Sequence, residues 1–215
     1  MKRPGPGRPK DPAKRRAILE AAKTLFPRHG YDGTSMDAVA ALAGVSKLTV
    51  YNHFGDKDTL FTEAVRERCE SQLPHALFER VASDRDLHSA LMEIARRTHE
   101  LVHSEEAMQL HRIMAGQGPG AHKLAQLFYQ AGPRRLLDEF EGLLARAHAD
   151  GRLHAPDPAL AAGHFFCLVK GLAHMQVLIG VRGPVQPAEA ATHLASVVEL
   201  FLRAHTPPAP CQKSG

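Results

Sequence analysis

The chain has 215 residues, of which 44% are apolar, and this is enough for one ordinary domain or two small ones with a true core. Its charge is unevenly distributed. Residues 1–60 carry 11 basic and 6 acidic side chains, a net of +5, whereas the remainder carries 16 and 17, a net of −1. The composition excludes a disordered or fibrous chain, and the basic N-terminal quarter predicts that this end meets a polyanion such as nucleic acid.

Three cysteines lie far apart in the sequence, at Cys69, Cys167 and Cys211. This spacing excludes a disulfide framework and a short-spaced zinc motif, and it fits a reducing compartment. A redox switch at Cys69 or Cys167 is the alternative to simple burial, which their apolar neighbours favour. Residues 1–10 are basic and rich in Pro and Gly without an apolar segment, so we expect no secretory signal and a cytoplasmic protein.

Helical periodicity runs through almost the whole chain. Residues 1–12 lack the apolar side chains that folding needs and are predicted to be a disordered basic arm, and residues 206–215 a disordered tail. No segment alternates apolar and polar residues over the length of a strand, so the fold class is all-α. About nine helices are expected, near residues 13–28, 35–43, 47–53, 57–81, 84–103, 105–115, 121–149, 158–179 and 187–204. Pro74 should bend or break the fourth of them, and Gly132-Pro133 should interrupt the seventh.

Residues 34–54 have the pattern of a helix-turn-helix. Thr34 and Asp37 have the spacing of a capping box for the first helix, and Gly44 supplies the left-handed residue that a tight reversal needs. Ser46 can cap the second helix. Because Val50 and Phe54 lie on one side of that helix, this side should pack against the protein.

The opposite side of the second helix is polar and suited to the major groove of DNA, where short side chains contact base edges and cations contact phosphates. Lys57, at the start of the next helix, adds a cation beside free amide groups. The alternative is an ordinary helical hairpin with a solvated polar face. The candidate DNA-binding residues are Thr34, Ser35, Ser46, Lys47, Leu48, Thr49, Tyr51, Asn52, His53 and Lys57.

The N-terminal arm contains Pro6-Gly7-Arg8-Pro9, which looks like the core of an AT-hook. An extended Arg8 between prolines can lie in a narrow minor groove. The alternative is an arm that contributes only charge, since the first 16 residues hold seven cations and one acid.

The N-terminal sequence also resembles the tetracycline-repressor (TetR) family of bacterial regulators over residues 13–65. The matching residues are Ile18-Leu-Glu-Ala-Ala, Leu25-Phe26, Gly30-Tyr31, Thr34-Ser35-Met36, Ala40, Ala43-Gly44-Val45-Ser46, Val50-Tyr51-Asn52-His53-Phe54 and Lys57-Asp58-Thr59-Leu60-Phe61. The resemblance implies a homodimeric, ligand-responsive repressor associated with the bacterial nucleoid. It places Thr34, Lys47, Thr49, Tyr51, His53 and Lys57 at DNA-contact positions. Leu48 departs from the small residue expected there, which leaves the base preference open.

Two C-terminal segments, 159–179 and 190–204, are apolar on almost every side. A membrane span would place Lys170 in the hydrocarbon at a cost of about 2.5–3.5 kcal/mol, so burial against a second copy of the chain is the better interpretation. Two such helices from each copy would form a four-helix bundle, which is also how TetR-type proteins dimerise. Gly163 and Gly171 would allow close helix approach. The predicted interface anchors are Phe165, Phe166, Val198 and Phe201.

The C-terminal half resembles the AefR-like subgroup of the TetR family, through Gln126–Pro133, Gly151–Leu153 and Pro156–Ala162. A small apolar effector is therefore expected, and no cofactor. The candidate pocket residues are apolar with a few polar points, although plain core packing is the alternative for each. They are Met92, His99, His103, Met108, His111, Phe128, Phe165, His174 and Met175.

His99-Glu-Leu-Val-His103 is a literal zinc-protease helix motif, in which two His bind the metal and the Glu polarises water. The residues that follow lack the third ligand of the known classes, so we expect no enzyme. A metal-sensing site that uses His99, His103 and His111 stays open as an alternative.

These observations together predict a DNA-binding transcriptional regulator. Residues 13–65 would form the helix-turn-helix domain, and residues 66–205 would bind the effector and dimerise. Two recognition helices about 34–36 Å apart would read a palindromic operator, and a bound effector would release the DNA by widening that spacing.

Overall fold

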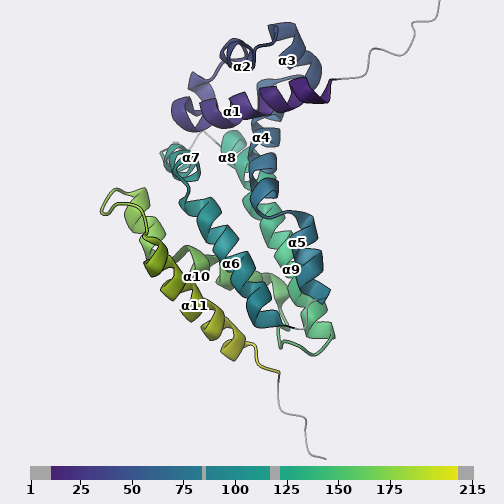
Figure 1. The fold of residues 1–215 in the computed structure, drawn as a ribbon, viewed down its shortest axis with the longest axis vertical. Coiled ribbons are helices and arrows are strands. Elements are labelled where there is room, and N and C mark those ends of the chain that lie inside the picture. Colours follow the sequence, from purple (N-terminus) through teal and green to yellow (C-terminus); the bar gives the residue numbers. More distant parts are fainter. Residues whose placement is uncertain (1–10, 84–85, 117–121, 208–215) are drawn as a thin grey trace, which may run out of the picture.

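The computed structural model describes residues 11–83, 86–116 and 122–207. Every regular element within these ranges is an α-helix, which confirms the all-α fold class. The bounds of the helices in Figure 1 are α1 Pro12–Gly33, α2 Met36–Leu42, α3 Lys47–Phe54, α4 Lys57–Gln72, α5 His75–Ser83, α6 Leu87–His103, α7 Glu105–Ala115, α8 His122–Ala131, α9 Pro133–Ala149, α10 Pro158–Leu178 and α11 Pro187–Ala204.

Two of the nine predicted helices are divided, which accounts for the eleven helices in the described part of the chain. Pro74 separates α4 from α5, and Gly132 precedes Pro133 at the first turn of α9. Proline lacks an amide hydrogen and clashes with the preceding turn, so both breaks lie where the sequence predicted them.

The first three helices form a compact unit at one end of the molecule, and α4 runs from this unit into the rest of the protein (Figure 1). Their core centres on Ile18, Phe26, Val50 and Phe61, but it also includes Leu110 of α7. The predicted domain boundary at residue 65 falls inside α4, which continues without interruption from Lys57 to Gln72. The N-terminal helices are packed directly onto the body formed by α5–α11.

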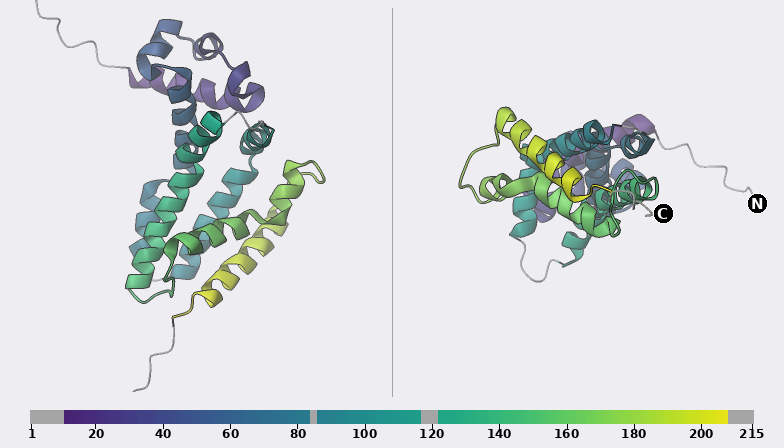
Figure 2. Two further views of the ribbon diagram at one scale, coloured as in Figure 1. Left: turned by 180° about the vertical axis from the view of Figure 1, so that it is seen from behind. Right: turned by 90° about the horizontal axis from the view of Figure 1, so that it is seen from below.

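The body has a separate aromatic core. The ring centroids of Phe140 and Phe165 lie 4.5 Å apart, and those of Phe165 and Phe201 lie 5.0 Å apart. These rings join α9, α10 and α11, and buried side chains of α6 such as Leu91 and Ile94 belong to the same core. Figure 2 shows α10 and α11 side by side at one flank of the body.

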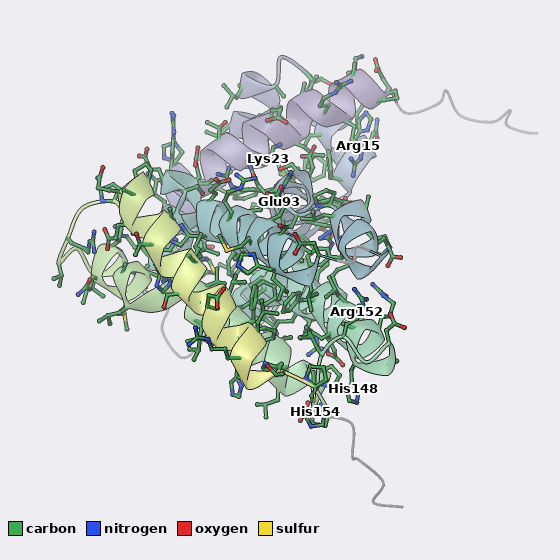
Figure 3. The ribbon with its side chains drawn as sticks, turned by 60° about the horizontal axis from the view of Figure 1, so that its bottom comes forward. Arg15, Lys23, Glu93, His148, Arg152 and His154 are labelled. Atoms are coloured by element: carbon green, nitrogen blue, oxygen red, sulfur yellow. The ribbon has the colours of Figure 1, made fainter. Side chains whose placement is uncertain are left out.

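The loop between α9 and α10 fastens the end of α11. The rings of His148 and His154 lie next to each other there (Figure 3), with centroids 5.7 Å apart. The amide of His154 donates a hydrogen bond of 2.8 Å to the carbonyl of His205. This backbone hydrogen bond joins the loop after α9 to the end of α11, about fifty residues later in the chain.

Three residues of the two segments predicted to be disordered make defined contacts. Asp11 caps α1, because its carboxylate accepts a hydrogen bond of 2.9 Å from the amide of Ala13, and Pro12 lies in the first turn. The hydroxyl of Thr206 donates to the carbonyl of Leu202 at 3.1 Å. The prediction was wrong for Asp11, Pro12 and Thr206. The rest of the arm and nearly all of the tail, residues 1–10 and 208–215, lie outside the described residues.

Two helices contain a glycine with positive φ that breaks their regularity. Gly30, with a φ of 72°, interrupts α1 where the sequence predicted its end. Gly171, with a φ of 66°, kinks α10, which the sequence predicted to be continuous. The imidazole of His193 on α11 donates from Nε2 to the carbonyl of Leu168 at 2.9 Å, so the neighbouring helix satisfies a backbone group near the kink.

Within the described residues, no helix combines the length and the apolar character that a membrane crossing requires.

Candidate DNA-binding surface and ligand pocket

The turn between α2 and α3 has the geometry that the sequence predicted. Gly44 has a φ of 66°, a conformation that side chains with a Cβ rarely adopt. The hydroxyl oxygen of Ser46 accepts a hydrogen bond of 3.2 Å from the amide of Thr49 and caps α3. These contacts fix the direction in which α3 leaves the turn.

The first helix of the motif is capped by Ser35 and not by Thr34. The Ser35 hydroxyl accepts from the amide of Ala38 at 3.0 Å. Thr34 is only 1% exposed, and its hydroxyl donates to the carbonyl of Gly30 at 2.7 Å. The predicted Thr34–Asp37 capping box was therefore wrong by one residue. Thr34 closes the end of α1, and its buried hydroxyl is not available to DNA.

Helix α3 presents the predicted face to solvent. Val50 and Phe54 are buried in the N-terminal core, and Leu48 is 69% exposed on the other side. Tyr51 and Asn52 are also exposed. Thr49 is half-buried, and its hydroxyl lies 2.8 Å from that of Ser46. The exposed side of α3 therefore combines polar side chains with two large side chains, Leu48 and Tyr51.

The cations around α3 already have partners in the protein. Lys47 forms an exposed ion pair of 2.9 Å with Asp37. The ammonium of Lys57 donates to the carbonyl of Tyr31 at 3.0 Å and lies 4.2 Å from the centre of that ring. An exposed pair is worth little, so a phosphate can compete for Lys47. Lys57 is half-buried and is held by a carbonyl and a ring, neither of which neutralises its charge.

Two further predicted DNA contacts are placed differently. The half-buried ring of His53 lies against Phe54, with centroids 6.2 Å apart. Arg8 lies outside the described residues. Eight of the predicted DNA contacts are accessible, and we call them the candidate DNA-binding surface. Six are exposed, Ser35, Ser46, Lys47, Leu48, Tyr51 and Asn52, and two are half-buried, Thr49 and Lys57.

A mostly apolar cavity of about 250 Å³ lies in the body, between α4, α6, α7, α8, α9 and α10. Of the predicted pocket residues, His111 and Phe128 line it, and so does Phe166, which the sequence assigned to the dimer interface. The sequence missed the two cations in its wall, Arg68 of α4 and Lys170 of α10. The signal for Lys170 was present, because it is a single charge within an otherwise apolar helix.

Several other predicted pocket residues do not line this cavity. Phe165 is fully buried in the aromatic core, and Met108 is 3% exposed. Met92 packs against the core of the body, whereas Met175 is 54% exposed on α10. The sequence identified the apolar side chains but not which face of each helix they occupy.

Cys69 and Cys167 both line the cavity. Burial raises the pKa of the Cys69 thiol to about 11, which keeps it protonated and poorly reactive. Cys167 is exposed. The Cys69 environment therefore favours packing over a thiolate-based switch.

The remaining predicted histidines form a cluster beside the cavity. The rings of His99 and His103 stack with centroids 3.9 Å apart, and His103 meets His174 edge to face at 5.3 Å. Nδ1 of His111 lies 3.2 Å from Nε2 of His174. Burial lowers the pKa values of His99, His111 and His174 to about 4, so these rings are neutral near pH 7.

The geometry argues against the two metal-based alternatives. Glu100 of the zinc-protease motif is exposed and accepts from Arg96 at 2.7 Å, so it does not face the two histidines. Among the residues that the structure describes, no group of three His, Cys, Asp or Glu side chains could hold a metal ion. The protease and metal-sensor interpretations therefore have no structural support.

Three of the four predicted interface anchors are buried within the single chain. Phe165 and Val198 are 0% exposed and Phe201 is 2% exposed, because they fill the core of the body. They cannot contact a second copy without unpacking that core, so this prediction was wrong. The large apolar side chains that α10, α11 and their connection do expose are Leu160, Leu168, Leu172, Met175, Ile179, Val181 and Leu200.

Comparison with known proteins decides the family. The family described as "Bacterial regulatory proteins, tetR family" matches residues 18–64, which contain the helix-turn-helix. The family described as "AefR-like transcriptional repressor, C-terminal domain" matches residues 89–207, more than half of the chain. The chain belongs to the TetR family. Both resemblances seen in the sequence are confirmed, and the protein is a TetR-family transcriptional regulator.

Individual proteins of the TetR family align with this chain over very different lengths. The chain is 36% identical over 93 residues to the uncharacterized regulator YhgD of Bacillus subtilis, which is 41% of this chain and 49% of YhgD. It thus spans about half the length of this curated relative. A putative TetR-family regulator from Mesorhizobium loti has a solved structure with 30% identity and a TM-score of 0.76, covering 91% of this chain and 99% of that one.

A second solved structure that this chain resembles contains a ligand. The SmeT–triclosan complex is 28% identical, covers 92% of this chain and 93% of that one, and has a TM-score of 0.64. This similarity extends over the body as well as over the DNA-binding helices.

Proposed function

We propose that this TetR-family regulator represses transcription by binding a palindromic operator as a homodimer, and that a small molecule in the apolar cavity releases the DNA. The observation that carries this proposal is the course of α4. Lys57 at its first turn belongs to the candidate DNA-binding surface, and Val65, Arg68 and Cys69 further along line the cavity. One helix therefore joins the two sites. DNA as the partner implies an action on the bacterial nucleoid in the cytoplasm.

Dimerisation is supported by the exposed apolar residues of α10 and α11. Leu172 of α10 is 73% exposed, Ile179 directly after α10 is 64% exposed, and Leu200 of α11 is 55% exposed. Figure 2 shows these two helices side by side at one flank of the body. A patch of this kind on a monomer marks an interaction surface. A two-fold axis through it would pair α10 and α11 with their copies and hold two α3 helices on one side of the dimer.

A second connection links the cavity to the DNA-binding helices through α7. Arg112 of α7 donates to the carbonyls of Val177 and Leu178 at 2.8 Å and 3.0 Å, which ties α7 to the end of α10. The same helix supplies Leu110 to the N-terminal core and His111 to the cavity. A ligand that displaces α7 or α4 would therefore shift α1–α3.

The test begins with duplexes selected from a random pool by the purified full-length protein. We expect a palindromic sequence bound by two chains, with an affinity that falls steeply as salt rises. The mass of the free protein in solution should equal two chains. Binding of one chain to a non-palindromic site, or a monomeric mass, would contradict the proposal.

A further inference from the structure

Lys170 is a half-buried cation in the wall of an apolar cavity. It lies on α10 directly before the kink at Gly171, and most of the neighbouring lining residues, such as Phe128 and Phe166, are apolar. Within the described part of the chain, its ammonium has no hydrogen bond or ion pair, and the lining residues include no carboxylate. A charge that is partly removed from water without a partner is unfavourable.

The second cation of the cavity is already neutralised. The Arg68 guanidinium donates from Nη2 to Glu106 Oε2 at 2.8 Å and to Ser104 Oγ at 3.1 Å. These bonds draw Arg68 towards the start of α7. Lys170 is therefore the cation that remains open to a bound molecule.

Other polar groups in or near the lining of the cavity also favour a ligand with a negative charge. Thr98 lines the cavity, is only 3% exposed, and its hydroxyl has no hydrogen-bond partner in the described part of the structure. The nearby His111 is neutral, because burial and the charge of Lys170 both lower its pKa. The wall thus offers the ammonium of Lys170 and the buried hydroxyl of Thr98 as donors without a partner, and the described lining residues include no carboxylate.

We propose that the effector is an apolar molecule with a single anionic oxygen group, and that the Lys170 ammonium binds this group. The inference rests on the proposed function, because it names the class of molecule that the cavity takes. Phe128, Phe166, Leu136 and Leu137 would surround the apolar part. Charge-assisted hydrogen bonds are stronger than neutral ones, so the acid should bind better than a neutral molecule of the same shape.

The experiment compares three apolar skeletons, naphthalene, biphenyl and an eight-carbon chain, each as the carboxylate, the primary amide and the primary ammonium. Binding to the full-length protein is measured by calorimetry at neutral pH. For at least one skeleton the carboxylate should bind about ten-fold more tightly than the amide, and the ammonium should bind most weakly. A panel without such a preference, or without binding, overturns the inference.

Substitution of the cation tests its role directly. Lys170→Met keeps the length of the side chain and should bring carboxylate and amide to within about two-fold of each other, whereas Lys170→Arg should retain the preference. Lys14→Met, which removes an exposed charge on α1, is the matched control and should change neither affinity. Equal melting temperatures would show that Lys170→Met is folded. A preference that survives in Lys170→Met overturns the inference.

The DNA readout separates this inference from the proposed function. If amides bind as well as acids and also release the operator, the function holds and the inference fails. If acids bind through Lys170 but leave operator affinity unchanged, the inference holds and ligand-controlled release fails.

Discussion

The N-terminal helices and the body of this regulator both combine local helix caps with contacts between distant residues, but their two sites depend on different ones. In α2, α3 and α4, a side chain next to the helix start, Ser35, Ser46 or Asp56, accepts a hydrogen bond from an amide three residues later, and these caps set the direction of the helix-turn-helix. Body helices have similar caps, but the core and the cavity of the body depend on contacts between distant residues, such as the Phe140–Phe165–Phe201 rings. Local bonds can be read from neighbouring residues, whereas distant contacts depend on the complete fold.

The largest expected effect contrasts two glycines with positive φ. A Cβ at Gly171 would lie 2.8 Å from Nε2 of His193, whereas a Cβ at Gly44 would meet nothing within 4 Å. Gly171→Ala should therefore reduce the free energy of unfolding by about 2–4 kcal/mol, from backbone strain and the lost His193 hydrogen bond. Gly44→Ala should lose only the strain, about 1–2 kcal/mol. Urea unfolding followed by circular dichroism gives both values.

The control for these glycines is Gly142→Ala in the regular helix α9. Its Cβ would meet only the flexible end of Arg146, at 3.6 Å. This substitution should stabilise the protein by about 0.5–1 kcal/mol, because alanine favours the helix. A loss at Gly142 equal to that at Gly171 would contradict the assigned kink.

The DNA-binding surface predicts two kinds of effect on affinity. Thr49→Ala should change the preference for one base pair by about 1 kcal/mol, because in the proposed complex its methyl and hydroxyl groups would face the groove. Lys57→Met and Tyr51→Ala should weaken binding to all duplexes alike, and Lys57→Met should also reduce the salt slope by about 1. Fluorescence anisotropy with matched operators provides the measurement.

A control for the DNA measurements is Arg134→Met, at an exposed position of α9 outside the candidate DNA-binding surface. It removes the same charge as Lys57→Met and should leave operator affinity unchanged. An unchanged affinity in Tyr51→Ala would show that the docking face is wrongly assigned.

Substitutions at helix caps should change the free energy of unfolding by a smaller amount, with a loss in the N-terminal helices and a gain in the body. Asp56 accepts from the amide of Thr59 at 2.7 Å, and Asp56→Ala should destabilise the protein by about 1 kcal/mol. Gln186 at the start of α11 makes no side-chain cap, although its backbone is extended as a cap requires. Gln186→Ser should stabilise by about 0.5–1 kcal/mol. Thermal unfolding of both variants tests this, and an opposite sign at either position would refute it.

A further prediction is a dependence of stability on pH through the buried histidines. Burial lowers the pKa values of His99, His111 and His174 to about 4, whereas a histidine in the unfolded chain has a pKa of about 6.5. Above pH 6.5 both states are neutral and the effect is absent. As pH falls below this value, the unfolded chain binds protons that the folded protein does not, so stability decreases towards pH 4.

The measurement is the melting temperature between about pH 7 and pH 5, where carboxylates remain mostly ionised. It should fall in the wild type and fall less in His174→Gln. His164→Asn, which replaces an exposed histidine on the same helix, should follow the wild type. Identical slopes in His174→Gln and the wild type would be evidence against neutral buried rings.

The sequence predicted the helix-turn-helix to within one residue because its signals are local. Gly44 and Ser46 act on their immediate neighbours, and only the cap at Thr34 moved, to the adjacent Ser35. Two side chains of similar chemistry stand side by side there. The choice between them depends on the end of α1, where the Thr34 hydroxyl donates to Gly30.

For the body, the sequence predicted the helices but not which side of each helix faces the core, the cavity or the solvent. A core and an interface with a second chain both need apolar side chains, so periodicity alone does not distinguish the two environments. This is why Phe165, Val198 and Phe201 were assigned to an interface although they lie in the core. The kink at Gly171 also rotates the rest of α10, so residues beyond it lie on other faces than a straight helix would give. The cavity is lined by six helices, and its position depends on how they pack, which periodicity within one helix does not predict.

The single helix that joins the two sites has a mechanical consequence. At 1.5 Å per residue, the 16 residues of α4 form a rod about 24 Å long. A tilt of about 5° around its cavity end would carry Lys57 sideways by about 2 Å, and a hydrogen bond to a phosphate tolerates much less than that. A ligand therefore needs to displace Arg68 and Cys69 only slightly, since the length of the rod amplifies a small movement inside the protein into a mismatch at the DNA.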